Sequence, residues 1–237
     1  MKKNYEMDMC SGPILGKLLT FTIPLIFSGI LQLLFNAADV IVVGRFAGSQ
    51  SLAAVGSTTA LINLMINIFI GLSVGVNVIV ARYYGAKREK DVQDTIHTAM
   101  ALSIVSGLFL IVVGQLLSRP MLELMGTPDD VIDKSTIYMR IIFIGMPANM
   151  IYNFGSAILR AVGDTKRPLY FLTAAGVINV VLNLFFVIMF RMDVAGVALA
   201  TAISQAISAC LVILCLMESE GGLKLHLKAL KIHRSKF

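Results

Sequence analysis

The sequence has 237 residues, of which 57% are hydrophobic and only 14% are charged, and its formal net charge is +6 at pH 7. Soluble domains carry about 25% charged residues, so this composition and a mean hydropathy of +0.82 predict an integral membrane protein. The basic residues lie between apolar stretches and form no single patch, which argues against a nucleic-acid partner and is typical of membrane topology signals.

Six apolar stretches follow one another along the chain, and each is long enough to cross a bilayer as a helix, which takes about 20 residues. Strands are not expected, because strict alternation is missing and membrane barrels use segments of about 10 residues. The sequence therefore predicts an all-α integral membrane protein, a six-transmembrane-helix bundle within residues 1–217 that is followed by a basic tail at 218–237. The expected helices lie at 18–43, 52–81, 96–117, 137–159, 169–190 and 194–217.

The first stretch carries an acid. Ser28, Gln32, Asn36 and Asp39 follow one another at steps of four, four and three, which places them on one helix face. A carboxylate at the centre of a membrane helix costs about 2.5–3.5 kcal/mol, and a functional role is the default interpretation. A buried Asp39 is suited to take up a proton or to bind Na⁺ together with amide oxygens. The alternative is that Asp39 lies near the outer membrane interface.

Most of the other stretches carry polar side chains at helical spacing. Thr201 lies on the sixth stretch, and Asn179 and Asn183 form a pair on the fifth. We expect these faces to turn inward and to line a hydrated cavity, although amides also join membrane helices by simple hydrogen bonding. The candidate cavity-lining residues are Gln32, Asn36, Asn63, Asn67, Asn149, Asn153 and Gln205.

Several residues predict breaks between or within the helices. Pro147 lies inside the fourth stretch, where breaks are tolerated next to cavities or at bends. The connection at 118–135 contains Pro120, Gly126 and Pro128, and we expect it to form short surface helices. Within this connection, Thr127 reads as an N-cap and Pro128 as the first helical residue.

The basic residues also predict the orientation in the membrane. Most of the 20 Lys and Arg residues fall before the first stretch, in the second and fourth connections, or in the tail. By the positive-inside rule, both termini are expected to be cytoplasmic.

Motifs for catalysis or for tightly bound cofactors are lacking. There is no GxSxG, HExxH, GxxxxGK or GxGxxG, so we expect a protein that is not an enzyme and has no cofactor. The three cysteines show no ligand spacing, and Cys210 and Cys215, which lie inside an apolar stretch, are expected to be small buried hydrophobic residues. His97, His226 and His233 are expected to be solvated at a helix end or in the tail, so the one expected metal is Na⁺ at Asp39.

Four segments together resemble the multidrug and toxic compound extrusion (MATE) family. They are FNAADVIVVGRFAGSQSLAAVG at 35–56, ILRAVGDTKRPLY at 158–170, NVVLNLFFV at 179–187 and AGVALATAISQ at 195–205. The resemblance implies a twelve-helix antiporter of the plasma (inner) membrane, of which this chain is the N-terminal lobe. Cationic or amphipathic organic compounds would leave as H⁺ or Na⁺ enters.

The resemblance also implies a cation site. By motif position this site would contain Asp39, Asn179 and Asn183, and by helix position Thr201 and Tyr138. Many family members have Asp at the position of Asn183, so here Asp39 would be the one acid of the cluster.

Two other functions stay open at this point. One is a flippase of the same superfamily for a lipid-linked precursor, although a phosphate would favour a cationic cavity rather than amides. The other is a truncated lobe or assembly subunit that does not transport. A single lobe would need a missing C-terminal lobe or a second copy as its partner, in addition to the lipid bilayer and the organic cation.

Overall fold

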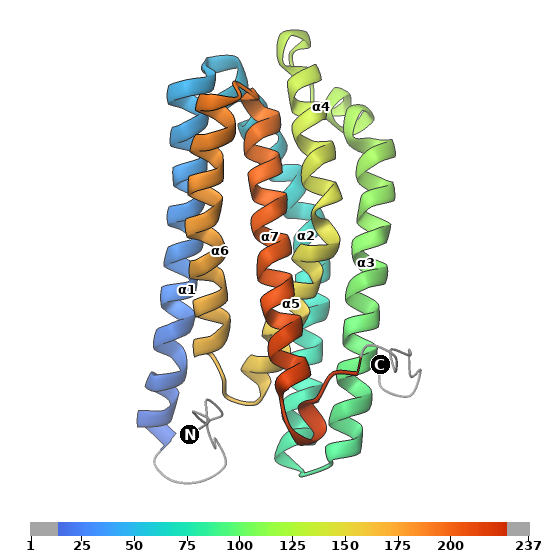
Figure 1. Ribbon diagram of the computed structural model, residues 1–237. Helices are drawn as coiled ribbons and strands as arrows, with labels where there is room; N and C mark the ends of the chain where they lie inside the picture. The colour runs from blue at the N-terminus through green and yellow to red at the C-terminus, as the bar shows by residue number, and fades with distance from the viewer. Residues whose placement is uncertain (1–13, 227–237) are drawn as a thin grey trace.

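The computed structural model describes residues 14–226, and within this range it is helical and contains no strand. Five helices are long and apolar enough to cross a membrane, and a bent pair of shorter helices makes a sixth crossing. The helices run roughly parallel or antiparallel in one bundle (Figure 1). The predicted six-helix membrane bundle is therefore confirmed.

Seven α-helices and three short helical turns build the bundle. The α-helices are α1 (Ile14–Val42), α2 (Ser49–Gly85), α3 (Glu89–Leu124), α4 (Asp129–Ile144), α5 (Met146–Ala161), α6 (Lys166–Leu184) and α7 (Asp193–Glu218). Two π-helical turns, η1 (Val43–Ala47) and η2 (Phe185–Met189), extend α1 and α6, and a 3-10 turn, η3 (Gly221–Leu223), follows α7. We call the end of the bundle at which α1 begins and α7 ends the proximal end, and the opposite end the distal end (Figure 1).

The connection between α3 and α4 differs from the sequence prediction. Pro120 lies inside α3, which continues to Leu124, so the expected short surface helices at 118–135 are wrong. Pro128 occupies the N-cap position of α4, and the helix begins at Asp129, so Thr127 lies outside the helix and is not its cap. A proline can continue a membrane helix where neighbouring groups satisfy the backbone, and here only a short turn separates the two helices.

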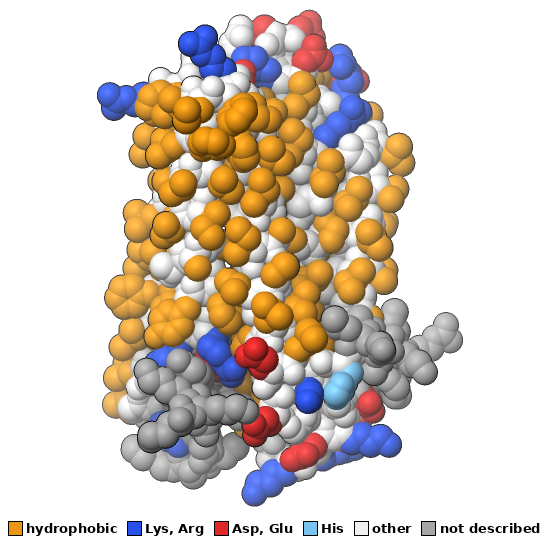
Figure 2. All heavy atoms as spheres, viewed as in Figure 1, with side chains coloured by type: hydrophobic (Ala, Val, Ile, Leu, Met, Phe, Trp, Pro, Cys, Tyr) orange, Lys and Arg blue, Asp and Glu red, His pale blue; other side chains and the backbone are white. Residues whose placement is uncertain are grey.

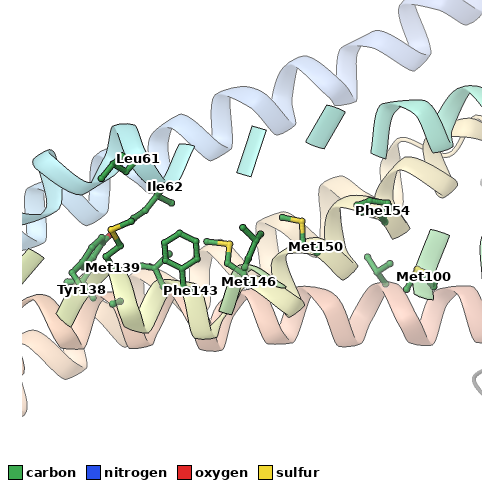
Figure 3. Packing of buried hydrophobic residues seen from close by; sticks show 14 of the residues in the cluster. Leu61, Ile62, Met100, Tyr138, Met139, Phe143, Met146, Met150 and Phe154 are labelled. Carbon is green, nitrogen blue, oxygen red and sulfur yellow. The ribbon is translucent and has the colours of Figure 1, made fainter. Parts of the chain in front are cut away.

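The fourth crossing is bent by 48° between α4 and α5. Pro147 lies in the first turn of α5, where its missing N–H costs no hydrogen bond. The predicted break at Pro147 is therefore confirmed. Large side chains fill the bundle along this bend, where Met139, Phe143 and Met146 pack in the interior (Figure 3).

Two glycines allow close helix contacts. A Cβ atom on Gly107 of α3 would lie 2.3 Å from Cα of Pro147, and one on Gly176 of α6 would lie 1.9 Å from Cε2 of Phe35. Contacts this short are impossible for a real side chain, so these glycines set the approach of α3 to α5 and of α1 to α6. The second contact seats the ring of Phe35, on the helix that carries Asp39, directly on α6.

The surface of the bundle is that of a membrane protein. Hydrophobic side chains cover its middle, while Lys, Arg, Asp and Glu gather at the two ends (Figure 2). Helix α1 is the least enclosed: its buried residues are Pro24, Ser28 and Val42. Helix α1 therefore packs mainly on α6 and exposes most of its surface.

The first part of the tail folds back onto α3. Leu223 and Leu225 are buried, and the backbone N–H of His226 donates to Nε2 of His97 over 3.1 Å. His97 is buried and its Nδ1 lies 2.7 Å from the carbonyl of Gln93, so the expected solvated state of this residue is wrong. The rest of the predicted tail, including His233, lies outside the described residues.

Candidate functional site

A chain of polar side chains joins α1, α6 and α7 in the distal half of the bundle. The amide nitrogen of Asn183 donates to the Asp39 carboxylate and also to Oδ1 of Asn179, over 3.2 Å. The amide nitrogen of Asn179 donates in turn to the hydroxyl of Thr201, over 3.3 Å. Three helices are thus connected through four of the predicted cation-site residues.

The local fold explains why these residues meet. Asn179 and Asn183 are one turn apart on α6, so both amides point from the same face. Phe35, one turn before Asp39, packs on the backbone of α6 at Gly176. Just beyond the site, α1 and α6 both change to π-helical turns, a local geometry that is frequent at functional sites.

Tyr138 approaches the same site from α4. Its side chain is buried, and it lies within range of the charge of Asp39. The structure therefore joins four of the five predicted site residues by hydrogen bonds, and Tyr138 lies buried on a fourth helix without a hydrogen bond to Asp39.

One buried oxygen in this cluster lacks a partner. Among the described residues, Oδ1 of Asn183 is enclosed and accepts no hydrogen bond. A buried acceptor without a donor is costly, and this one lies on the side chain that holds Asp39. Carboxylate, amide and hydroxyl oxygens are the ligands of hard cations, and a carboxylate is also a proton acceptor. The cluster is thus chemically suited to bind either a hard cation or a proton.

The predicted cavity-lining residues do not meet in one interior space. Asn153 donates to Asn149 within α5 over 2.8 Å, and both are partly buried, as is Gln205. Four others are exposed on the surface of α1 and α2 instead of facing the bundle interior: Gln32, Asn36, Asn63 and Asn67. Apolar side chains fill the interior, and these four amides of α1 and α2 lie on the outside of the bundle.

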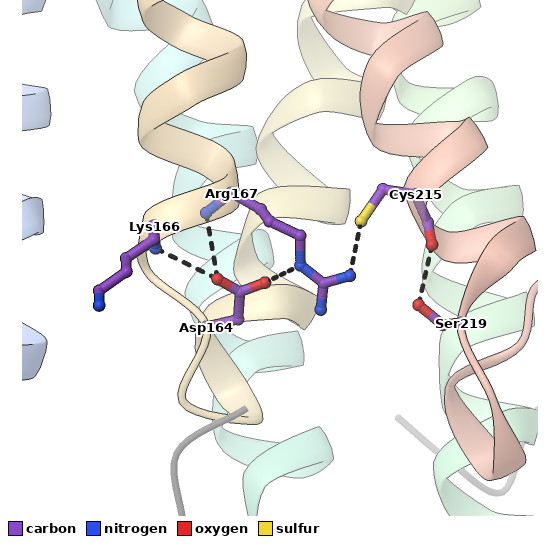
Figure 4. Close-up of polar contacts among 5 residues, drawn as sticks. All are labelled: Asp164, Lys166, Arg167, Cys215 and Ser219. Carbon is purple, nitrogen blue, oxygen red and sulfur yellow. Dashed lines mark hydrogen bonds and ion pairs between the residues drawn. The ribbon is translucent and has the colours of Figure 1, made fainter. Parts of the chain in front are cut away.

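Sequence reasoning missed a polar cluster at the proximal end (Figure 4). Asp164 is fully buried, and it accepts hydrogen bonds from the backbone N–H groups of Lys166 and Arg167. Its other oxygen pairs with the Arg167 guanidinium, which donates to Sγ of Cys215 on α7 over 3.2 Å. An Asp just before a helix is a familiar capping signal, and the GDTKRP segment contains it.

Comparisons with known proteins agree with the fold and the resemblance. The MatE family model matches residues 24–185. The chain is similar to the probable multidrug resistance protein YoeA of Bacillus subtilis (strain 168), with 35% identity over 78% of this chain and 41% of YoeA. It is also similar to the probable multidrug resistance protein YpnP of the same organism, with 31% identity over 85% of this chain and 45% of YpnP.

The fold is also that of solved structures. The structure described as MATE in the bent conformation matches 93% of this chain and 49% of that chain, with a TM-score of 0.85 and 24% identity. The chain thus spans about half the length of the proteins that it matches.

Proposed function

This chain belongs to the MatE family, and from that premise we propose that it forms one six-helix lobe of a secondary active antiporter. In this proposal the protein exports cationic or amphipathic organic compounds as H⁺ or Na⁺ enters. The observation that carries the proposal is the acid of α1, Asp39, held by the amide of Asn183 in a chain that continues to α7.

Neutralisation of Asp39 is the proposed coupling step. A proton or Na⁺ at the carboxylate removes its charge and changes the bond to Asn183. Because α1 packs mainly on α6, this bond is one of the few polar ties that hold α1 in place. A ligand shifts a conformational equilibrium by its difference in affinity for the two states, and here that difference would arise where α1 meets α6.

The exposed amides of α1 and α2 support the proposed substrate class. Gln32, Asn36, Asn63 and Asn67 are polar but uncharged, which suits an organic cation better than a phosphate group. The names of the two Bacillus subtilis relatives, both probable multidrug resistance proteins, also favour drug efflux over a flippase or a lobe that does not transport. We propose that these amides face a second lobe and line the substrate path between the two.

The proposed orientation has both termini in the cytoplasm. The connections at the proximal end carry Lys87, Arg88, Lys166 and Arg167, and positive charge favours the cytoplasmic side. The distal end, with Asp39 near it, would then face outward. In the inner membrane this places the acid within reach of the inward ion gradient.

The test is the accumulation of a cationic fluorescent dye in cells that express the complete natural gene. We expect Asp39→Asn to abolish dye efflux because an amide can neither take up a proton nor neutralise Na⁺. Asp133→Asn removes an exposed carboxylate from the same end of the bundle and is the matched control. Efflux by Asp39→Asn at the wild-type rate and protein level would disprove the mechanism.

A further inference from the structure

An ion pair at the distal end joins three helix ends. The ammonium of Lys134 on α4 lies 2.7 Å from Oδ2 of Asp193, the first residue of α7. The same ammonium donates to the hydroxyl of Ser51 over 3.0 Å, and Ser51 is fully buried in the first turn of α2. The side chains of Lys134 and Asp193 are 35% and 31% exposed, so this is no freely solvated surface pair.

Asp193 is held in an unusual conformation. Its φ is +54°, and Arg191 two residues earlier has a φ of +52°. The left-handed region is uncommon for residues other than glycine, with Asp and Asn enriched among the exceptions. Such conformations persist where the surrounding structure fixes them. The Oδ1 atom of Asp193 is buried and has no partner among the described residues. The ion pair between Oδ2 and Lys134 therefore anchors the carboxylate.

The register of the two helices places this pair over the candidate cation site. On α4, Tyr138 lies one turn after Lys134 and therefore on the same face. On α7, Thr201 lies about two turns after Asp193. The ion pair of Lys134 with Asp193 thus joins α4 to α7 on the distal side of Tyr138 and Thr201.

Helices α2 and α4 have a second tie. The hydroxyls of Ser57 and Ser135 lie 3.1 Å apart, and Ser135 also contacts the carbonyl of Ala54. Breaking the ion pair therefore leaves α2 and α4 joined and acts mainly on the spacing between α4 and α7.

We propose that Lys134, Asp193 and Ser51 form a clamp that sets the spacing between Tyr138 and Thr201 in the cation site. The clamp residues are positioning residues, because they lie one and two turns from the site and do not touch the ion. This inference rests on the proposed function, since it assigns the clamp to the coupling-ion site. Without the ion pair, α4 and α7 are less firmly held, and the oxygens around Asp39 lose their fixed geometry.

The experiment measures dye transport in membrane vesicles as a function of coupling-ion concentration, with the protein expressed from its complete natural gene. Lys134→Met and Asp193→Asn each remove one charge, and Asn tolerates the left-handed conformation at 193. We expect each variant to need a several-fold higher ion concentration for half-maximal transport, with a maximal rate close to that of the wild type. The double variant Lys134→Met with Asp193→Asn removes both charges of the pair, and because the two act through one bond it is expected to shift the half-maximal concentration no further than either single variant does.

Two further variants make the outcome specific. Asp133→Asn breaks the exposed pair with Arg119 beside the clamp and is expected to leave the ion dependence unchanged. Asp39→Asn tests the proposed function in the same assay. If this variant keeps the wild-type ion dependence, both the proposed function and the clamp are overturned. If Asp39→Asn abolishes ion dependence while the clamp variants show no change, or lose rate without a shift in half-maximal concentration, only the clamp is overturned.

Discussion

At the scale of single residues, Asn183 decides how Asp39 is held. Its amide nitrogen donates to both Asp39 and Asn179, while its own oxygen is buried without a partner in the described part of the chain. An Asp at this position would bring a second negative charge beside Asp39. With Asn, the site has one acid, so the candidate coupling chemistry depends on a single carboxylate.

Asp164 is the residue for which we predict the clearest stability effect. Asp164→Ala removes the acceptor of two backbone N–H groups at the start of α6 and leaves Arg167 without its carboxylate. Loss of a helix cap alone lowers the free energy of unfolding by about 0.5–2 kcal/mol, so we expect a lower melting temperature in detergent micelles.

Asp164→Asn separates the two contributions of this side chain. An amide oxygen still accepts from the backbone N–H groups, but the ion pair with Arg167 is lost, so we expect an intermediate melting temperature. Lys166→Ala alters an exposed neighbouring side chain and serves as the control. Equal melting temperatures for Asp164→Ala and the wild type would contradict this role for the cap.

The sequence predicted which polar residues share a helix face better than it predicted what that face contacts. Spacing places Gln32 and Asn36 on one face of a helix, but periodicity does not say whether that face meets the bundle interior or another surface. The structure shows both exposed. The burial of His97 was unpredictable for a related reason: its partner, the backbone of His226, lies 129 positions away in the chain.

At the scale of helices, close approach of backbones positions the fourth crossing. We predict that Gly107→Ala lowers the free energy of unfolding by about 1–3 kcal/mol, the usual cost of overpacking, because its Cβ would meet the backbone of Pro147. Gly56→Ala on α2 is the matched control, since a Cβ there meets no atom within 4 Å. Chemical unfolding in micelles compares the two, and equal effects would refute this packing argument.

The contact of the tail segment with α3 gives a second prediction at this scale. His97→Leu removes the acceptor of the His226 N–H, so the segment from Gly221 to His226 should detach more often. We expect faster tryptic cleavage after Lys224, which mass spectrometry detects.

The control for the tail is His226→Ala. This variant keeps the backbone N–H that donates to His97, so cleavage after Lys224 should stay near the wild-type rate. If both variants behave alike, the hydrogen bond to His97 does not hold the tail.

The helices themselves were largely predictable because lipid-spanning segments need long apolar stretches, and six such stretches are present. Their ends were not, since α3 runs through Pro120 and begins at Glu89, well before the expected residue 96. Hydropathy reports the apolar part of a helix, whereas these helices continue into polar ends. The bend at Gly145 was indicated by Pro147, but its angle depends on packing that the sequence does not reveal.

At the scale of the whole molecule, the chain is one lobe whose outer surface is mostly apolar but carries exposed amides on α1 and α2. Hydrophobic side chains cover most of the middle of the bundle (Figure 2), while α1 and α2 expose four amides. Because the chain spans about half the length of its relatives, we expect the amide-bearing surface to meet a second lobe. The proposed ion-driven movement is then a movement of α1 and its neighbours at that interface.

The most direct test of this account is ion-driven dye uptake into everted membrane vesicles that contain the protein expressed from its complete natural gene. H⁺ and Na⁺ gradients are imposed separately, with Asp39→Asn and Asp133→Asn measured beside the wild type. The account predicts that one of the two gradients drives uptake in the wild type and in Asp133→Asn, and that neither drives uptake in Asp39→Asn. Uptake by Asp39→Asn that still responds to the gradient as the wild type does would contradict it.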